Sequence, residues 1–382
     1  MKYFSRFSIW ALALWALGAF FYPQSAAAES RETRIVLGAV LPLSGENASQ
    51  GIDAERGIQL ALKTHAPALA GKGLKVKMVM VDDRSDPEQG KKVTRALIEE
   101  EHVQAIIGPF TSPVFLAMSP IVQQNRVVLM SGSATTPKIR KAGDYAFTLV
   151  TPDDRQGKAL ARFAYEILRA RQGVILYLDN DYGREFQKVV HREFARLGGS
   201  VDWVHGIIKG TTDFSAILEK VKDLDPHAVF FLTYPAEGGL LLKQARDIGL
   251  EAPFLGGDGV YSQDLIDIAG EAARNTFASA MNWRLKSPKP HVRDFVKRFT
   301  TQYGLQPNLY SASYYDATTI ILQSLMAGKL DAESMRQHIE QSRFQGATGE
   351  IHFESDHAVK KPIDIFKVED YTFDYFQTIM TH

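Results

Sequence analysis

The stretch that decides the fold is RIVLGAVLPLSG, residues 34–45, together with the segment that follows it. Residues 34–41 are a continuous apolar run of strand length, and the Pro-Leu-Ser-Gly end of the stretch predicts a turn. Residues 52–62 then carry apolar side chains at helical spacing. Because the strand lacks apolar/polar alternation, this strand-turn-helix unit is typical of a parallel sheet that helices cover on both faces.

The unit recurs after this start. The first series continues through expected strands at 74–81, 103–107 and 127–131, with expected helices at 87–101 and 113–123 between them. A second series begins near Pro152. Its expected strands are 173–178, 201–207 and 228–232, and its expected helices are 155–169, 184–197 and 238–248. The sequence therefore predicts an α/β protein with two units in succession, which share the later helices at 290–303 and 310–326 and the strands at 351–353 and 363–367.

Composition narrows the class of protein. The chain has 382 residues, 45% of them hydrophobic, which is enough for about two domains with separate cores. Its 44 basic and 44 acidic residues balance, which argues against a nucleic-acid partner. The sequence contains no cysteine. Thiol catalysis, cysteine-zinc sites and a lipid-modified cysteine are therefore excluded.

The first thirty residues have the pattern of a secretory signal peptide. Lys2 and Arg6 precede an apolar run at 7–21, and Ala26 to Ala28 supply the small residues of a cleavage site. The alternative is a retained membrane anchor, but the apolar run is shorter than the roughly 20 residues that span a bilayer. We expect cleavage near Ala28 and a mature protein in the periplasm of a Gram-negative cell.

Candidate binding residues follow the strands. In open parallel sheets, ligands bind beyond the carboxyl ends of the strands. At these positions the first unit offers hydroxyls, Ser112, Ser133 and Thr135, and the second offers Tyr182, Tyr234 and Asp258. Hydroxyls at a helix start suit an anion such as a carboxylate. An acid between two glycines suits an ammonium group, and tyrosines suit an apolar body or a cation.

Each of these residues also has a structural interpretation. Ser112, before a proline, is a common helix N-cap, and Ser133, Thr135 and Asp258 are common turn residues. The tyrosines could pack at a domain edge. The acidic run Asp82-Asp83 with Asp86 lacks the spacing of a calcium loop, so a solvated or capping role is expected. No Gly-x-Ser-x-Gly elbow, Walker loop, dinucleotide fingerprint or His-Glu-x-x-His motif occurs, so we expect no enzyme, no cofactor and no metal site.

An ordered set of motifs resembles one family. The chain is similar to the leucine/isoleucine/valine-binding proteins, the type I periplasmic solute-binding proteins of branched-chain amino-acid ABC transporters. The resemblance covers Ile35 to about Phe366. The motifs are Leu43-Ser44-Gly45 with Gly51, Asp82-Asp83-Arg84-Ser85-Asp86-Pro87, Ile107-Gly108-Pro109, Ser131-Gly132-Ser133-Ala134-Thr135, Asp181-Tyr182-Gly183, Asp213-Phe214-Ser215, Gln244-Ala245-Arg246-Asp247-Ile248-Gly249-Leu250 and Gly257-Asp258-Gly259.

The resemblance implies two Rossmann-like lobes with parallel central sheets, joined by three hinge crossovers, that close on a ligand. It places residues 31–151 and 281–349 in lobe 1, and residues 152–280 and 350–382 in lobe 2, after a signal peptide at 1–28.

The resemblance also assigns roles to the candidates. Ser112, Ser133 and Thr135 would hold the α-carboxylate of an amino acid, and Thr135 with Asp258 would hold its ammonium. Tyr182 and Tyr234 match aromatic positions, and Gln50 matches an aromatic beside the ligand side chain.

Four positions, in three departures, differ from the family pattern. Ser85 and Thr111 replace the cysteines of a disulfide that some members have. Asp258 replaces a longer glutamate, and Gln50 makes the side-chain pocket more polar. The implied function is therefore a monomeric, non-enzymatic receptor that delivers a branched-chain or related amino acid to an ABC permease in the inner membrane.

Two other classes stay open at this stage. A ligand-sensing module would use the same fold for a short amide or a small carboxylic acid. A periplasmic hydrolase would need a nucleophile within reach of a base, and no histidine falls at a strand end.

Overall fold

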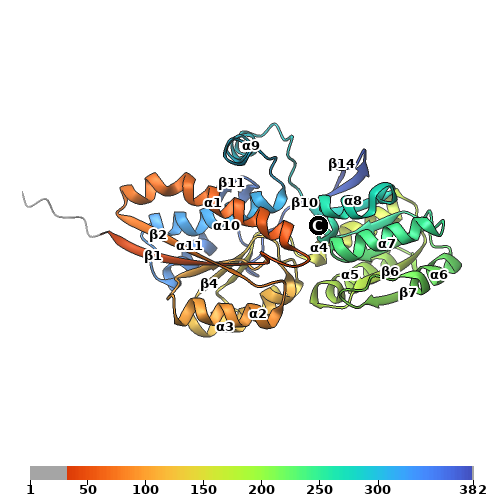
Figure 1. The fold of residues 1–382 in the computed structure, drawn as a ribbon, viewed down its shortest axis with the longest axis horizontal. Helices are drawn as coiled ribbons and strands as arrows, with labels where there is room; N and C mark the ends of the chain where they lie inside the picture. The colour runs from red at the N-terminus through yellow and green to blue at the C-terminus, as the bar shows by residue number, and fades with distance from the viewer. Residues whose placement is uncertain (1–31, 381–382) are drawn as a thin grey trace, which may run out of the picture. The chain divides into compact units, whose positions relative to one another are not determined.

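The computed structural model describes residues 32–380, so the expected signal peptide at 1–28 lies outside the described residues. Two main sheets organise this part of the chain, and each is flanked by helices (Figure 1). We refer to each sheet with its helices as a lobe. None of the helices from residue 32 to residue 380 combines the length and apolar character needed to cross a membrane.

The first sheet is parallel throughout and has the strand order β2-β1-β3-β4-β5. Its strands are β1 Thr33–Leu41, β2 Leu74–Asp82, β3 Ala105–Ile107, β4 Val128–Ser131 and β5 Ala146–Thr148. Leu37 of β1 pairs with Met78 of β2 on one side and with Ala105 of β3 on the other. Since β1 has neighbours on both sides, its continuous apolar sequence is explained by burial on both faces.

Helices cover both faces of the first sheet, as the sequence predicts. One face packs against α1 Ala48–Gly71, α10 Leu309–Met326 and α11 Ala332–Gln341, and the core there includes Leu37, Ile58 and Tyr314. The other face packs against α2 Pro87–Glu99 and α3 Ser112–Asn125. This two-sided core fixes the carboxyl ends of β1, β3 and β4, which carry the candidate loops.

The second sheet has the order β14-β13-β10-β9-β8-β6-β7. Its parallel strands are β6 Gln172–Leu178, β7 Ser200–Ile207, β8 Ala228–Leu232, β9 Phe254–Gly256 and β10 Thr276–Met281. Two antiparallel strands, β13 Ile363–Glu369 and β14 Thr372–Ile379, complete one edge. The flanking helices are α4 Asp153–Arg162, α5 Asp181–Arg196, α6 Ser215–Leu224, α7 Pro235–Asp247 and α8 Gln263–Ala269.

Short elements complete the described chain. The 3₁₀ turns are Pro137–Lys141, Asp258–Val260 and Gly270–Ala273, and a π-helical turn, Phe163–Ile167, extends α4. Helix α9 Pro290–Tyr303 and the hairpin of β11 Phe344–Gly346 with β12 Gly349–Ile351 lie between β10 and β13 in the chain.

The described chain passes between the two sheets after β5, after β10 and before β13. Ile351, Phe353 and Val359 pack in the core of the first lobe. Their packing puts the last passage after Val359, later in the chain than the expected boundary at residue 350. The first and last passages are bonded side by side, because Thr151 Oγ1 accepts the Lys361 N–H at 3.0 Å.

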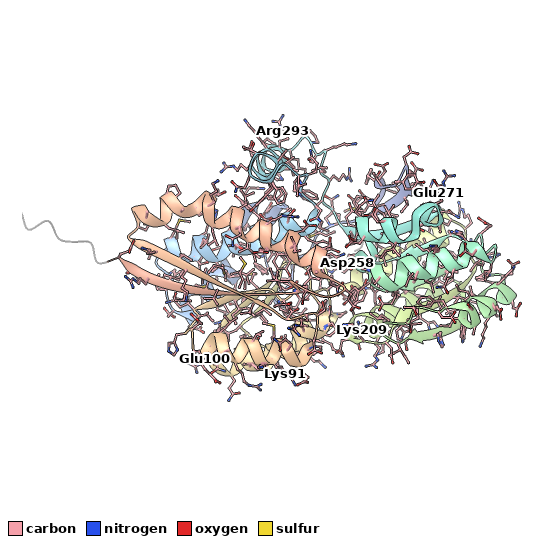
Figure 2. The ribbon with its side chains drawn as sticks, in the orientation of Figure 1. Lys91, Glu100, Lys209, Asp258, Glu271 and Arg293 are labelled. Atoms are coloured by element: carbon pink, nitrogen blue, oxygen red, sulfur yellow. The ribbon has the colours of Figure 1, made fainter. Side chains whose placement is uncertain are left out.

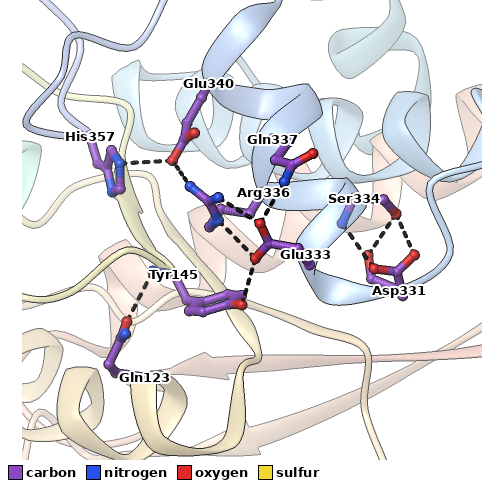
Figure 3. A network of polar contacts seen from close by, with 9 residues as sticks. All are labelled: Gln123, Tyr145, Asp331, Glu333, Ser334, Arg336, Gln337, Glu340 and His357. Carbon is purple, nitrogen blue, oxygen red and sulfur yellow. Dashed lines mark hydrogen bonds and ion pairs between the residues drawn. The ribbon is translucent and has the colours of Figure 1, made fainter.

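A polar network ties α11 to the rest of the first lobe (Figure 3). Glu333 accepts the hydroxyl of Tyr145 at 2.8 Å and forms an ion pair with Arg336 at 2.7 Å. Arg336 also pairs with Glu340, whose Oε1 lies 3.0 Å from Nε2 of His357. The network therefore joins the residue before β5, helix α11 and the segment before β13. Such partly exposed pairs each contribute little, and their main effect is to fix the position of the helix.

Candidate ligand-binding site

One small cavity collects nearly all the residues that the sequence predicts. Its volume is about 20 Å³, which is room for one water molecule rather than for an amino acid. A larger ligand therefore requires the lining to move apart. The lining residues are Phe110, Ser112, Ser133, Thr135, Tyr182, Tyr234, Asp258, Gly259 and Tyr310. Six of the seven predicted residues are in this set, and they come from the strand ends of both sheets.

Ser112 lies at the start of α3, but it does not cap that helix. The N-cap is Thr111, which makes no side-chain capping bond, and Ser112 is the first helical residue and is 2% exposed. The alternative interpretation of Ser112 as an N-cap is therefore wrong. Its hydroxyl lines the cavity at the positive end of the α3 dipole. This arrangement suits a negatively charged group.

The loop after β4 is held rigidly by its own hydroxyls. Ser131 Oγ accepts the N–H groups of Ser133 at 3.2 Å and Ala134 at 2.9 Å. Ser133 Oγ donates to the carbonyl of Phe110 at 2.7 Å and lies 2.9 Å from the hydroxyl of Tyr314. Ser133 is therefore already hydrogen-bonded within the protein. In this structure it positions the loop, while Thr135 beside it lines the cavity.

Two stacked tyrosines form the opposite wall. The rings of Tyr182 and Tyr234 are 5.3 Å apart and inclined by 13°. Tyr182 comes from the first turn of α5, where Asn180 caps the helix, and Tyr234 is the N-cap residue of α7. Both follow strands of the second sheet. Because aromatic faces attract cations, this wall suits an ammonium group or an apolar side chain.

Asp258, which Figure 2 labels, follows β9 after Gly257 and lies close to Tyr182. The Tyr182 hydroxyl accepts the Gly259 N–H at 3.1 Å and donates to Asp258 Oδ1 across 3.4 Å. From the first lobe, the Tyr310 hydroxyl donates to the Asp258 carbonyl at 2.9 Å. The carboxyl group is thus held where the two lobes meet.

The glycines on either side of Asp258 are required by close approach. A Cβ on Gly257 would lie 2.6 Å from the Tyr182 hydroxyl and 2.1 Å from the ring of Phe186. A Cβ on Gly259 would lie 2.8 Å from the same hydroxyl. These contacts are too short for any side chain, so the Gly-Asp-Gly sequence allows the tyrosine to reach the acid.

The electrostatics of the cavity favour a cation near Asp258. Burial raises the pKa of Asp258 to about 7, although hydrogen bonds from Gln156, Gly259 and Tyr182 oppose the shift. Burial also raises the pKa values of Tyr182, Tyr234 and Tyr310, and the nearby charge of Asp258 raises them further. A bound cation would oppose the rise in the pKa of Asp258, because it stabilises the ionised carboxylate, and it would also offset the effect of that charge on the tyrosines.

Gln50 is the predicted residue that does not line the cavity. Its side chain, 3% exposed, donates from Nε2 to Ser262 Oγ at 3.0 Å and to Asp264 Oδ2 at 2.9 Å. The resemblance places Gln50 beside the ligand side chain, whereas the structure places it outside the cavity. Gln50 instead joins α1 of the first lobe to the start of α8 of the second.

Partly exposed ion pairs of two lysines also connect the lobes. Lys138 Nζ lies 2.7 Å from Asp181 and 3.5 Å from Glu185. Lys209, labelled in Figure 2, lies 2.8 Å from Glu46. Pairs of this kind are weak in water, so they guide how the lobes meet rather than hold them together.

Three lining residues were not among the predicted ones. Phe110 and Gly259 lie close to predicted residues in the loops after strands, so the expectation that ligands bind in those loops could have found them. Tyr310 could not be found that way, because it lies in the first turn of α10, far from any strand end in the chain. Among residues 32–380 no cluster of three or more potential metal ligands occurs.

Comparisons with known proteins agree with this architecture. A family model for periplasmic binding proteins matches residues 34–372. The Leu/Ile/Val-binding protein homolog 1 of Brucella suis is 27% identical over 333 residues, covering 86% of this chain and 88% of that protein. The solved leucine-binding protein LivK of Thermotoga maritima is 28% identical, with a TM-score of 0.85 over 90% of this chain and 98% of its own.

A more distant structure shares the fold. A solute-binding protein of an ABC transporter from R. palustris, solved in complex with benzoate, has a TM-score of 0.83 at 19% identity, covering 91% of this chain and 96% of its own. The two-lobed α/β fold is therefore that of the type I periplasmic binding proteins, which bind solutes and are not enzymes. The chain belongs to the periplasmic binding protein family and is the substrate-binding protein of an ABC transporter.

Proposed function

We propose that the protein binds a zwitterionic amino acid in the cavity and delivers it to an inner-membrane permease. The observation that carries this proposal is the division of charge across the cavity. Ser112 at the α3 N-terminus and Thr135 face it from the first lobe, and Asp258 with two stacked tyrosines faces it from the second. An α-carboxylate suits the first set and an α-ammonium suits the second. The Brucella relative and LivK, both named as binders of branched-chain amino acids, support the same ligand class.

The competing ligand is a small aromatic acid, such as the benzoate bound by the R. palustris protein. Benzoate carries one negative charge and no positive group. It would leave the buried carboxyl of Asp258 without a counter-charge, which is unfavourable. The acid in the second wall therefore favours an amino acid over an aromatic acid.

Titration calorimetry on the purified protein tests the proposal. The panel contains the twenty L-amino acids and benzoate, with two analogues of leucine that each lack one charge: 4-methylpentanoate lacks the ammonium and leucinamide lacks the carboxylate. We expect at least one amino acid to bind. If it is leucine, each analogue should bind about a hundredfold more weakly, as for loss of a buried charged contact. Benzoate binding in preference to every amino acid would refute the proposal.

Delivery requires the protein to be outside the cytoplasm. We propose that the segment at 1–28 is removed near Ala28 and that the mature chain acts in the periplasm as a monomer. Its lobes would close on the ligand about the three passages between the sheets, with the segment up to Val359 in the first lobe. Mass spectrometry of the protein from a periplasmic fraction, with size-exclusion chromatography, checks these points. A mature mass that retains residues 1–28 would contradict cleavage.

A further inference from the structure

The segment from residue 285 to residue 303, which includes helix α9, is strongly basic. It contains five lysines and arginines and one acid, Asp294, whereas the whole chain has 44 basic and 44 acidic residues. All five basic side chains are exposed, and we call them the α9 basic face: Lys286, Lys289, Arg293, Lys297 and Arg298. One sign of charge concentrated in a balanced chain indicates a partner of the opposite sign.

Helix α9 separates its apolar residues from its charged ones. Its buried residues share a core cluster with residues of α1 and α10, and they are Val292, Phe295 and Phe299. Arg293, labelled in Figure 2, and Lys297 are exposed, and helical spacing puts them on the other side of the helix. The apolar side therefore holds α9 in place, and the charged side is presented to solvent.

The α9 basic face has no counter-charge within residues 32–380. None of its five side chains forms an ion pair there, and neither does Asp294. Arg293 and Lys297 are four residues apart on one helix, a spacing at which like charges repel each other. These cations are therefore available to an external anion, which would also reduce their mutual repulsion.

Helix α5 of the second lobe carries cations in a different setting. Lys188, Arg192 and Arg196 are exposed and are also four residues apart. Two of them pair with acids of their own helix, Lys188 with Glu185 at 3.0 Å and Arg196 with Glu193 at 2.7 Å. A row of cations on a helix is thus compensated in α5 and uncompensated in α9.

The positive charge of this face acts on neighbouring groups. Burial lowers the pKa of His291 in the first turn of α9, and the charges of Lys289 and Lys361 lower it further. Burial also lowers the pKa of His65 of α1, and the charge of Arg298 adds to that shift. Both histidines therefore experience a positive potential, as expected where cations lack counter-charges.

The exposed side of α9 offers charge without apolar contacts. None of the exposed large apolar side chains of the described residues lies between 285 and 303, and Leu305 is the nearest one in the chain. Specific protein interfaces depend on buried aromatic and apolar anchors, and lysine is depleted in them. A row of lysines and arginines without such anchors instead suits the diffuse negative charge of a lipid surface.

We propose that the α9 basic face binds the anionic phospholipid headgroups of the membrane that carries the permease. The binding is weak and reversible, because it depends on charge alone and inserts no apolar side chain into the lipid. It raises the concentration of the protein beside the permease. The proposal goes beyond the proposed function and uses none of the residues that line the cavity, so it holds for any ligand that the cavity takes.

Co-sedimentation with lipid vesicles tests the proposal. The mature protein without residues 1–28 is used, because the apolar run at 7–21 would itself bind lipid. One set of vesicles contains equal parts of phosphatidylglycerol and phosphatidylcholine, and the other contains phosphatidylcholine alone. We expect binding only to the first set at about 20 mM salt, and its loss at about 500 mM, because salt screens exposed charges. Equal binding to both sets, or binding to neither, would overturn the proposal.

A triple variant assigns the binding to α9. Lys289→Gln, Arg293→Gln and Lys297→Gln together remove three exposed cations and leave the buried side of the helix unchanged. Each lysine or arginine near an anionic membrane strengthens binding about fivefold, so the variant should bind the phosphatidylglycerol vesicles roughly a hundredfold more weakly. Thermal melting is recorded first to confirm folding.

The matched control is the triple variant Lys188→Gln, Arg192→Gln and Arg196→Gln of α5. It has the same change in net charge and the same spacing on a helix. Its vesicle binding should fall by less than about threefold, because charges away from the contact with the membrane are screened. Equal losses in the two triple variants would show that net charge, and not the α9 basic face, governs the binding.

A last arm separates lipid from protein as the partner. Native inner-membrane vesicles are tested before and after protease treatment, beside the phosphatidylglycerol vesicles. Binding to both kinds of vesicle that survives the protease supports the lipid surface. Binding to native vesicles alone, lost after the protease, would mean that the partner is an acidic protein surface, and the proposal would be wrong. If the α9 variant does not fold, the lipid and salt dependence of the unmodified protein decides.

Discussion

Gln50 of α1 and Asp264 of α8 are joined by a hydrogen bond of 2.9 Å between Nε2 and Oδ2. The two helices belong to different lobes, so this bond exists only while the lobes are together. Gln50 Oε1 is buried without a partner, and its amide also donates to Ser262. The residue therefore acts on the closed arrangement of the lobes rather than on a ligand in the cavity.

We predict that Gln50→Ala weakens ligand binding without touching the ligand. Loss of a hydrogen bond of this kind costs about 0.5–1.5 kcal/mol, so the affinity should fall by roughly threefold to tenfold. The change should appear as faster dissociation, because the closed state opens more readily. Stopped-flow kinetics measures it. Gln59→Ala, an exposed glutamine on the same helix, is the control. Equal dissociation rates for the Gln50 variant and the parent would show that the bond does not hold the lobes.

Two glycine-to-alanine changes should act in opposite directions. Gly257→Ala places a methyl group 2.1 Å from the Phe186 ring and 2.6 Å from the Tyr182 hydroxyl. Such overpacking costs about 1–3 kcal/mol and should also displace Tyr182 from Asp258. Gly71→Ala meets nothing within 4 Å and lies in the last turn of α1, so it should stabilise the protein by up to about 1 kcal/mol. Urea denaturation measures both. The close-approach argument fails if Gly257→Ala is as stable as the parent.

The sequence predicts the longer strands and helices well, because their apolar patterns extend over many residues. The strand expected at 34–41 is β1, and the helix expected at 310–326 is α10 within one residue. Strands β5 and β10 were missed. The first has three residues, too few for a pattern, and the second, TFASAM, mixes small and polar residues. Its burial comes from its place inside the second sheet, which the local sequence does not encode.

The part of the candidate site that lies in the loops after parallel strands was predictable from the sequence. Ser112, Thr135, Tyr182, Tyr234 and Asp258 converge because parallel strands place their following loops at one edge. Tyr310 was missed, because it enters the cavity from α10, a helix that lies far from any strand end in the chain. Gln50 was misplaced for a related reason, since its contacts depend on how the second lobe meets the first.

The acidic run after β2 also contains one residue whose burial the local sequence does not predict. Asp86 caps α2 by accepting the Gln89 N–H at 2.7 Å, in keeping with the expected capping role. Asp83 is instead fully buried, so a solvated role is wrong for it. It accepts the Ser85 N–H at 2.7 Å, and its second oxygen has no partner. Burial raises its pKa to about 7.

This raised pKa predicts a pH-dependent effect of Asp83→Asn. Between its ordinary value and about 7, the folded protein holds a proton on Asp83 that the unfolded chain releases. The free energy of unfolding therefore falls as pH rises through this window, and the loss is complete above about pH 7. Asparagine keeps an oxygen to accept the Ser85 N–H and has no charge to bury. The variant should be close to the parent near pH 4 and clearly more stable at pH 8.

Thermal melting from pH 4 to pH 8 checks this prediction. Other buried acids titrate in the parent and in the variant alike, so the difference between the two curves isolates Asp83. Glu100→Gln, at an exposed carboxylate on the same lobe (Figure 2), is the control and should show no such trend. A constant difference between Asp83→Asn and the parent across the range would disprove the assignment.

The final prediction concerns the charges buried where the chain passes between the lobes. Lys361 Nζ donates to the Thr348 carbonyl at 2.9 Å and to its hydroxyl oxygen at 2.7 Å. Asp316 of α10 accepts the Thr348 N–H at 2.7 Å and the Ala347 N–H at 2.6 Å. Burial lowers the pKa of Lys361 to about 8, and the charge of Asp316 opposes that shift. Each charge thus compensates the other across Thr348.

Lys361→Met leaves Asp316 buried without its counter-charge, so the free energy of unfolding should fall by about 2–5 kcal/mol. Asp316→Asn in the same chain removes the stranded charge. The double variant should therefore recover at least about 1 kcal/mol relative to the sum of the single effects. Lys360→Met, at the exposed neighbouring position, should change stability by less than about 0.5 kcal/mol. Guanidinium denaturation of the four chains and the parent measures the cycle. Strict additivity would mean that the two charges do not interact, and that the bonds between the Thr151 hydroxyl and the Lys361 backbone hold the passage without help from the charges.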